Sequence, residues 1–365
     1  MRLHFFVRTH RLTPELAGII ADTMDLPSIL AWRRTCIINY AHATAALKRT
    51  LTTAINPFLS HPLAFLDIIS RYGAVIGGEV ALAFVRRQQP LQVNTLEVFT
   101  GSTLYDALLR ELLSDPQIAP DIVGTTITIS RYPYNLQRDV LETTQLHLRT
   151  TRTIHIRRSS TLSPLSPIAR SICTAVVNFV SLHSFGCAYP LLTLNNKSLL
   201  SDHRTDSSAD IDAALMRTLT EYGIDVAVDP AEWHQYRTWS PTPAAAESMK
   251  ACWRSHYICP EQGRFFGDRG SMVDFLDPLG TPVTALRNRG LPPFGTSVIW
   301  RLASSYRCPL SCEARDSTLP NGQTSTAIIL MDDPFVRPFR GKRGLLSHPP
   351  RTSHASGRRT RSYTK

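Results

Sequence analysis

The chain has 365 residues, of which 43% are hydrophobic and 8% aromatic, so it can bury a sizeable core and form two or three domains. This composition excludes a wholly disordered, collagenous or coiled-coil protein. The net charge of +11 is concentrated in residues 334–365, which hold nine of the 40 basic residues and no acidic one. The remaining 31 basic and 29 acidic residues nearly balance, so the charge does not predict a nucleic-acid groove built into the fold.

The number of cysteines and the length of the apolar stretches indicate in which cellular compartment we expect the protein. The seven cysteines are an odd number in a long chain, and the first residues lack the apolar run of a signal peptide. The longest apolar stretch, residues 172–182, is too short to span a bilayer and contains Asn178. We therefore expect a cytoplasmic or nuclear protein with reduced thiols and no contact with a membrane.

Three helix-forming patterns fill residues 1–56. Thr13-Pro14-Glu15 and Asp25-Leu26-Pro27 are helix starts, because each places a capping side chain before a proline in the first turn. A third apolar stripe runs from Ile37 to Ile55 with gaps of three and four residues. Three short helices make a bundle that is marginal by itself, so we expect it to pack on a partner or on a neighbouring domain.

The run LTPELAGIIADTMDLPSILAWRRT, residues 12–35, resembles the F-box motif. The resemblance implies docking onto a Skp-type adaptor of a cullin ubiquitin ligase, to which the rest of the chain would bring an unknown target protein. The positions that match the motif's contacts are Leu12, Pro14, Leu16, Ile19, Ile20, Leu26 and Leu30. The alternative is a plain helical cap on the next domain. A docking surface leaves an apolar patch exposed, whereas a cap buries it.

Helical and strand patterns alternate over residues 57–200, which predicts a mixed α/β domain. In chain order we expect a helix over 61–71, a strand at 74–76, a turn at Gly77-Gly78 with a buried helix after it, a strand at 96–99, a helix over 103–113, strands at 126–130, 145–148 and 153–156, and a helix over 167–182.

The strand, Gly-Gly turn, helix and second strand resemble the nucleotidyltransferase fold. In that family the glycines let the backbone approach the nucleotide phosphates. Two alternate carboxylates on one strand and a third on a later strand hold two Mg²⁺ ions. The glycines here are Gly77 and Gly78, but the carboxylate positions carry Thr95, Glu97 and, near the third, His155.

One carboxylate cannot hold two divalent ions. The resemblance therefore implies an inactive nucleotidyltransferase-like domain with a degenerate nucleotide site at Gly77, Gly78 and Glu97, and no cofactor. The glycine turn also fits a tight strand-to-helix connection that binds nothing. The alternative function is a divergent Mg²⁺-dependent nucleotidyltransferase in which Asp106 or Asp139 joins Glu97.

From Leu12 to about Cys312 the chain resembles a family of basidiomycete-type fungal proteins to which no reaction is assigned. An F-box-like start precedes the glycine-turn segment in that family, and residues 166–194 and 300–312 match the runs that follow it there. The resemblance implies an α+β architecture. Its parts are F-box-like helices at 1–56, the nucleotidyltransferase-like domain at 57–200, a Cys-containing region at 201–333 and a basic tail at 334–365.

The Cys-containing region holds a weak set of zinc candidates: Cys252, His256, Cys259, Cys308 and Cys312. Structural zinc needs four ligands from turn-spaced pairs. The two pairs here lie about 50 residues apart, wider than in common zinc modules. We therefore favour buried cysteines that pack as small hydrophobes, with zinc as the alternative.

The tail, residues 334–365, is rich in Arg, Ser, Pro and Gly, which predicts disorder. Its clusters at 340–343 and 358–361 could be nuclear-import signals or could attract nucleic acid through the phosphates. A solubilising tail with no partner is the alternative.

Overall fold

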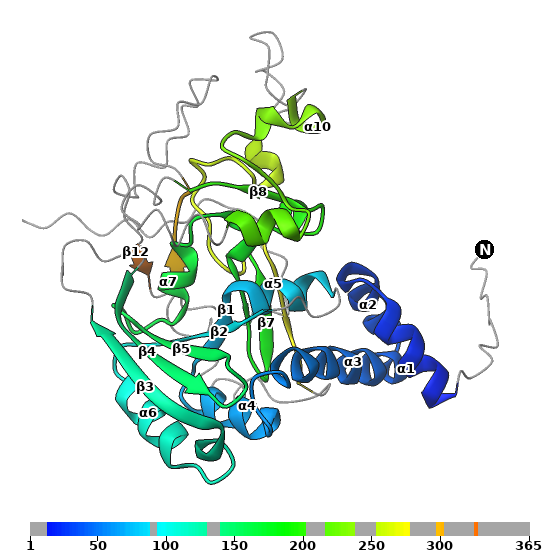
Figure 1. Ribbon diagram of the computed structural model, residues 1–365. Coiled ribbons are helices and arrows are strands. Elements are labelled where there is room, and N and C mark those ends of the chain that lie inside the picture. Colours follow the sequence, from blue (N-terminus) through cyan, green and yellow to red (C-terminus); the bar gives the residue numbers. More distant parts are fainter. Residues whose placement is uncertain are drawn as a thin grey trace, which may run out of the picture. The chain divides into compact units, whose positions relative to one another are not determined.

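The computed structural model describes residues 13–87, 93–129, 139–201, 216–237, 253–277, 297–302 and 325–327. The chain divides into two compact units, Met1–Ile329 and Leu330–Lys365. All described residues belong to the first unit, and the predicted basic tail lies outside them. The first unit combines helices with a large mixed sheet, which confirms the predicted mixed α/β class (Figure 1).

Three helices begin the described chain, as predicted: α1 (Pro14–Thr23), α2 (Leu26–Arg33) and α3 (Ile37–Ile55). The hydroxyl of Thr13 caps α1 by accepting the Leu16 N–H at 3.4 Å, and the Asp25 carboxylate caps α2 by accepting the Ser28 N–H at 2.8 Å. Each cap precedes a proline in the first turn, where the helix needs no donor. Both α1 and α2 pack on α3 (Figure 1).

Eight described strands form one sheet in the order β10-β7-β6-β1-β2-β5-β4-β3. Their bounds are β1 (Val75–Gly77), β2 (Thr95–Thr100), β3 (Ile122–Ile129), β4 (Val140–Leu148), β5 (Thr153–Ser159), β6 (Asn178–Val180), β7 (Ser184–Cys187) and β10 (Met272–Phe275). Strands β2 and β5 run parallel, whereas every other pair of neighbours in this sheet is antiparallel.

The remaining described elements are short. The helices are α4 (Pro62–Arg71), α5 (Gly78–Arg86), α6 (Tyr105–Ser114), α7 (Leu165–Ala169), α8 (Pro190–Thr193) and α10 (His234–Arg237), with 3₁₀ turns η1 (Ala119–Asp121), η3 (Thr174–Val176), η5 (Pro230–Glu232) and η7 (Trp253–His256). Two small sheets pair β8 (Lys197–Leu199) with β9 (Asp225–Ala227) and β11 (Ser297–Ile299) with β12 (Ser325–Ala327). No described helix is long and apolar enough to cross a membrane.

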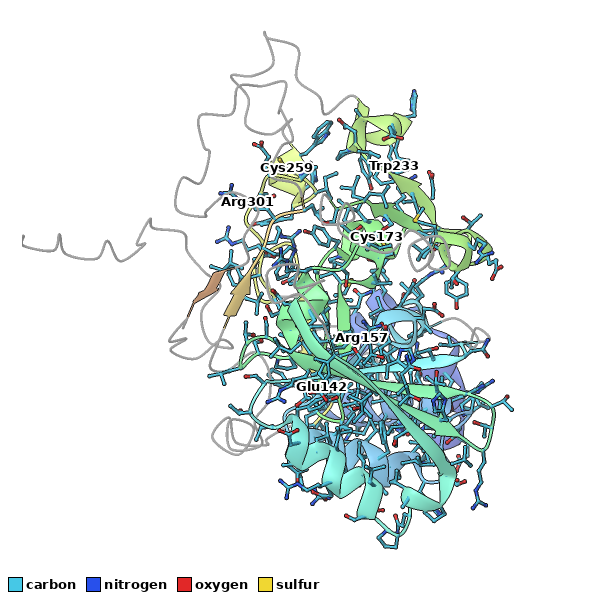
Figure 2. The ribbon with its side chains drawn as sticks, turned by 60° about the vertical axis from the view of Figure 1, so that its left-hand side comes forward. Glu142, Arg157, Cys173, Trp233, Cys259 and Arg301 are labelled. Atoms are coloured by element: carbon cyan, nitrogen blue, oxygen red, sulfur yellow. The ribbon has the colours of Figure 1, made fainter. Side chains whose placement is uncertain are left out.

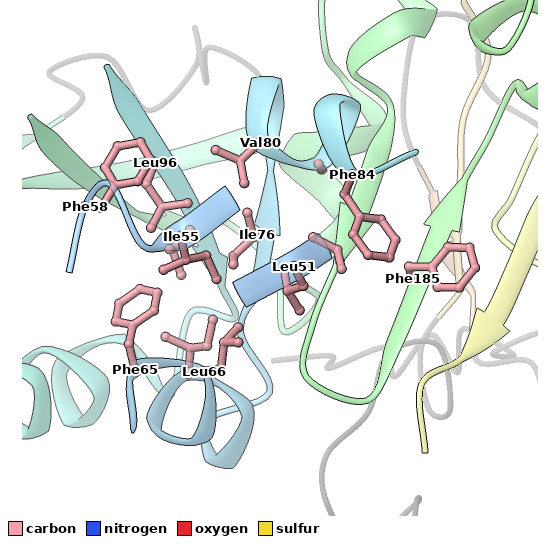
Figure 3. Packing of buried hydrophobic residues seen from close by; sticks show 14 of the residues in the cluster. Leu51, Ile55, Phe58, Phe65, Leu66, Ile76, Val80, Phe84, Leu96 and Phe185 are labelled. Atoms are coloured by element: carbon pink, nitrogen blue, oxygen red, sulfur yellow. The ribbon is translucent and has the colours of Figure 1, made fainter. Parts of the chain in front are cut away.

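The largest core lies between the N-terminal helices and one face of the sheet. Leu51 and Ile55 of α3 pack with Phe65 of α4, Ile76 of β1 and Leu96 of β2 (Figure 3). Alternate residues of a strand share one face, so the inward side chains of β1, β2 and β5 all contribute to this cluster. The three N-terminal helices and the sheet therefore bury one continuous apolar core.

The second face of the sheet divides into an apolar part and a polar part. Val75, Phe99 and Phe179 belong to a separate core cluster that also contains Tyr189 and Trp300. Further along the same face, β2, β5 and β4 carry polar residues at the alternate positions: Thr95, Glu97, Thr153, His155, Arg157, Thr143 and Gln145. These side chains are half-buried, so strands β2, β5 and β4 present a polar, partly open surface.

The predicted helix over 167–182 is wrong. The structure divides that stretch into α7, η3 and β6. The Asn178 amide helps to end the 3₁₀ turn by donating to the Ala175 carbonyl at 2.6 Å. Residues 172–181 are buried on every side, so their apolar spacing marks no helix face.

Candidate functional site

The predicted glycine turn is present where β1 ends and α5 begins. Gly78 has a φ of +61°, a conformation that glycine adopts without strain. A Cβ on Gly77 would lie 2.6 Å from Cε2 of Phe99, and a Cβ on Gly78 would lie 2.2 Å from Oε2 of Glu97. The side chains of β2 therefore occupy the space above both glycines, and this packing accounts for the Gly-Gly pair.

Three positions of the predicted nucleotide site meet across adjacent strands. Gly77 of β1 is in register with Glu97 of β2, and Glu97 is in register with His155 of β5. Thr95 is in register with Thr153, and the two hydroxyl oxygens are 3.4 Å apart. The register therefore makes Gly77, Glu97 and His155 neighbours across β1, β2 and β5.

A guanidinium lies against the carboxylate of this site. Arg157 donates from Nη2 to Oε1 of Glu97, and each side chain is 25% exposed. Figure 2 labels Arg157 on the sheet, where it also lies 5.8 Å from the ring centroid of Phe99. Arg157 therefore supplies the positive charge that a bound cation would supply to Glu97. Sequence reasoning missed Arg157, although its position two residues after His155 places it on the same face of β5.

A second carboxylate, Glu79, lies near Glu97 and was also missed. The hydroxyl of Tyr222 donates to Oε2 of Glu79 at 3.2 Å. Burial raises the pKa of Glu79, and the nearby charge of Glu97 adds to that rise. Glu79 directly follows Gly78 in the first turn of α5, so the sequence could have indicated it as a carboxylate of the turn.

His155 completes the group of titratable side chains on this surface. Burial lowers its pKa, and the charge of Arg157 lowers it further. A neutral imidazole and an ion-paired carboxylate thus lie in register on neighbouring strands. This arrangement can donate and accept hydrogen bonds. In the described part of the chain, no group of three or more His, Cys, Asp or Glu side chains is placed to hold a metal ion.

The two acidic residues considered as further metal ligands are engaged elsewhere. Asp106 lies 3.7 Å from Arg158, which alternation places on the opposite face of β5 from Arg157. The Asp139 carboxylate accepts the Ser166 hydroxyl at 2.6 Å and Nη1 of Arg170 at 3.1 Å. Neither contact brings these carboxylates to Glu97.

The predicted adaptor contacts divide between surface and core. Leu16 and Ile19 of α1 are 51% and 61% exposed, whereas Leu26 and Leu30 of α2 are buried. Pro14 is exposed and Ile20 is half-buried, while Leu12 lies outside the described residues. The structure thus places Leu16 and Ile19 on a surface that a partner can reach, and places the two leucines of α2 in the core.

The weak zinc candidates are described only in part. Cys259 is 4% exposed and packs in the cluster that contains Trp253 and Phe266. His256 ends η7, three residues before it. Cys252, Cys308 and Cys312 lie outside the described residues. Of the predicted ligand set, the structure describes Cys259 and His256.

Comparison of the chain with models of known families, with curated proteins and with solved structures finds no match.

Proposed function

We propose that the chain is a non-catalytic interaction protein whose N-terminal helices dock onto a Skp-type adaptor of a cullin ubiquitin ligase. The observation that carries this proposal is the exposure of Leu16 and Ile19, which lie three residues apart on one side of α1. The other side of α1 is buried at Ala17 and Ala21. Two exposed apolar side chains on a helix whose opposite face is buried in the protein form a surface that a partner can cover.

The sheet surface supports the non-catalytic part of the proposal. Metal-dependent nucleotidyl transfer needs carboxylates that are available to cations. The Glu97 carboxylate instead contacts the Arg157 guanidinium and lies over Gly78. In this proposal the eight-stranded sheet binds a protein target, and the polar surface on β2, β5 and β4 forms part of the contact.

Co-expression with a Skp-type adaptor tests the docking step. The wild-type chain should co-purify with the adaptor, and the double substitution Leu16→Asp with Ile19→Asp should abolish the complex. Leu63→Asp is the matched control, because Leu63 on α4 is 61% exposed, as Ile19 is. Circular dichroism of each variant checks that it is folded. Absence of a wild-type complex, or equal loss in the Leu63 variant, contradicts the proposal.

One observation favours the second candidate, a divergent Mg²⁺-dependent nucleotidyltransferase. Glu79 directly follows Gly78, and a Cβ on Gly78 would lie 2.2 Å from Oε2 of Glu97, so both acidic residues lie at the glycine turn. Two carboxylates can hold Mg²⁺ if the Arg157 guanidinium moves away from Glu97. Transfer of a nucleoside monophosphate that requires Mg²⁺, disappears in Glu79→Gln and Glu97→Gln, and persists in Asp106→Asn would support this candidate over the first.

A further inference from the structure

A cavity of about 650 Å³ lies where α2 begins, α5 ends and α8 leads into β8. Its size falls within the range of roughly 300–1,000 Å³ that is common for small-molecule sites. Figure 1 shows α5 ending beside α2. The cavity is lined by Asp25, Leu26, Pro27, Arg86, Pro190, Leu191, Leu194, Asn195 and Asn196. It is separate from the glycine turn, which lies at the other end of α5.

Arg86, the last residue of α5, lines this cavity with an incompletely bonded guanidinium. Its Nη2 donates to Oδ1 of Asn196 at 2.8 Å and to the carbonyl of Tyr222 at 3.1 Å. Its Nε and Nη1 are enclosed and have no hydrogen-bond partner within the described residues. An arginine carries five N–H donors, so three of them remain without an acceptor.

A buried guanidinium with unpaired N–H donors destabilises the folded state unless acceptors pair with those donors. Arg86 is only 9% exposed, and in the described part of the chain it forms no ion pair. Burial lowers the pKa of Arg86, in keeping with a cation that lacks a counter-charge. An anion in the adjoining cavity would supply the missing acceptors if the guanidinium turned its enclosed Nε and Nη1 toward the cavity, and a planar carboxylate would then match its paired donors.

The other lining residues narrow the class of ligand. Leu26, Pro27, Pro190, Leu191 and Leu194 offer an apolar wall. Asp25 also lines the cavity, and the hydrogen bonds that its carboxylate accepts from Ser28 lower its pKa, so the carboxylate is charged at neutral pH. A negative charge at this position disfavours a doubly charged phosphate and favours a ligand that also carries a hydrogen-bond donor.

We propose that this cavity is a binding site for a small monocarboxylate with an apolar body and an amino group, with its carboxylate on Arg86, its amino group toward Asp25 and its apolar part against the leucines and prolines. The site is independent of adaptor docking by α1.

Calorimetric titration of the full chain with four probes tests the site. The probes are 3-phenylpropionate, its neutral match 3-phenylpropanamide, its ammonium-bearing match L-phenylalanine, and inorganic phosphate. We expect L-phenylalanine to bind more tightly than 3-phenylpropionate, and the amide and phosphate to bind at least about tenfold more weakly than either. Arg86→Met should weaken binding of both carboxylates by at least about tenfold.

Asp25→Asn is the second variant, because asparagine caps a helix as well as aspartate does and so leaves α2 intact. It should keep binding of 3-phenylpropionate and lose the preference for L-phenylalanine. Absence of carboxylate binding at millimolar concentration, or undiminished binding in a folded Arg86→Met chain, overturns the proposal. If Arg86→Met does not fold, an unchanged preference between the two carboxylates in Asp25→Asn overturns it.

Discussion

The Glu97 carboxylate lies over Gly78 so closely that a Cβ at position 78 would be 2.2 Å from Oε2. Gly78 also has a φ of +61°, which an L-residue adopts only at a cost. Gly78→Ala should therefore lower the free energy of unfolding by about 1–2 kcal/mol through its backbone conformation, and somewhat further because the Glu97 carboxylate must shift from its place beside Arg157. Denaturant unfolding of the purified variant measures this loss.

Gly223 provides the matched control for that substitution. Its φ of +66° is similar, but a Cβ there would meet no heavy atom within 4 Å. Gly223→Ala should cost only the conformational part, about 1–2 kcal/mol. In the double variant Gly78→Ala with Glu97→Ala, the loss should be smaller than the sum of the two single losses, since removal of the carboxylate frees the space. Equal losses at both glycines, with full additivity, would show that Glu97 does not pack on the turn.

The stability of the chain should depend on pH through Glu79. Burial raises the pKa of Glu79 above its ordinary value of 4.5, so the folded state holds the proton more tightly than the unfolded state. The stability that Glu79 contributes is therefore complete below pH 4.5 and is lost as the pH rises through the folded pKa. Relative to Glu79→Gln, the wild-type unfolding free energy should fall as the pH rises above 4.5.

Tyr222→Phe tests the direction of that effect. The Tyr222 hydroxyl donates to the Glu79 carboxylate and so opposes the rise in its pKa. Removing the hydroxyl should raise the pKa of Glu79 further and move the loss of stability to higher pH. Thermal melting of the wild type, Tyr222→Phe and Glu79→Gln at a series of pH values measures how the stability of each depends on pH. Parallel curves for wild type and Glu79→Gln would contradict the prediction.

The predicted adaptor contacts should differ in what they do to stability. Leu26 is fully buried at the start of α2, so Leu26→Ala should lower the free energy of unfolding by about 2–5 kcal/mol. Leu16 is half-exposed on α1, so Leu16→Ala should change it by about 0.5 kcal/mol or less. In an adaptor-binding assay the folded Leu16 variant should nevertheless bind more weakly. Similar stability losses at both positions would place Leu16 in a core instead.

The sequence predicted most elements whose signal is local. Thr13 and Asp25 mark helix starts because a cap and the following proline are adjacent in the chain. Gly77-Gly78 marks the strand-to-helix turn for the same reason. The helix predicted over 167–182 was wrong because nearly every residue of that stretch is buried. A continuous apolar run of this kind does not distinguish a helix from a succession of short irregular elements.

The candidate site was predictable only where strand alternation sufficed. Glu97 and His155 were recognised, but their pairing depends on the parallel register of β2 and β5, which spacing alone does not give. The Arg157 ion pair depends on the same register. Arg86 was missed entirely, because its significance arises from a cavity between segments about 60 and 110 residues away along the chain.

Nucleic-acid binding through the tail, predicted from sequence, is tested by truncation after Asp333. The change removes all nine basic residues of 334–365 and leaves a net charge of +2. Because the first unit ends at Ile329, before the truncation point, its melting temperature should not change. Binding to single-stranded RNA, measured by fluorescence anisotropy, should be lost, since counterion release from the phosphates needs these charges.

The two basic clusters of the tail make this prediction quantitative. Replacing Arg340, Lys342 and Arg343 with Gln removes three positive charges, as does replacing Arg358, Arg359 and Arg361. With about 0.7 counterions released per neutralised phosphate of a single strand, each triple variant should reduce the slope of log affinity against log salt by about 2. If the truncated chain binds RNA as tightly as the full chain and with the same salt slope, the RNA-binding surface lies in the first unit and not in the tail.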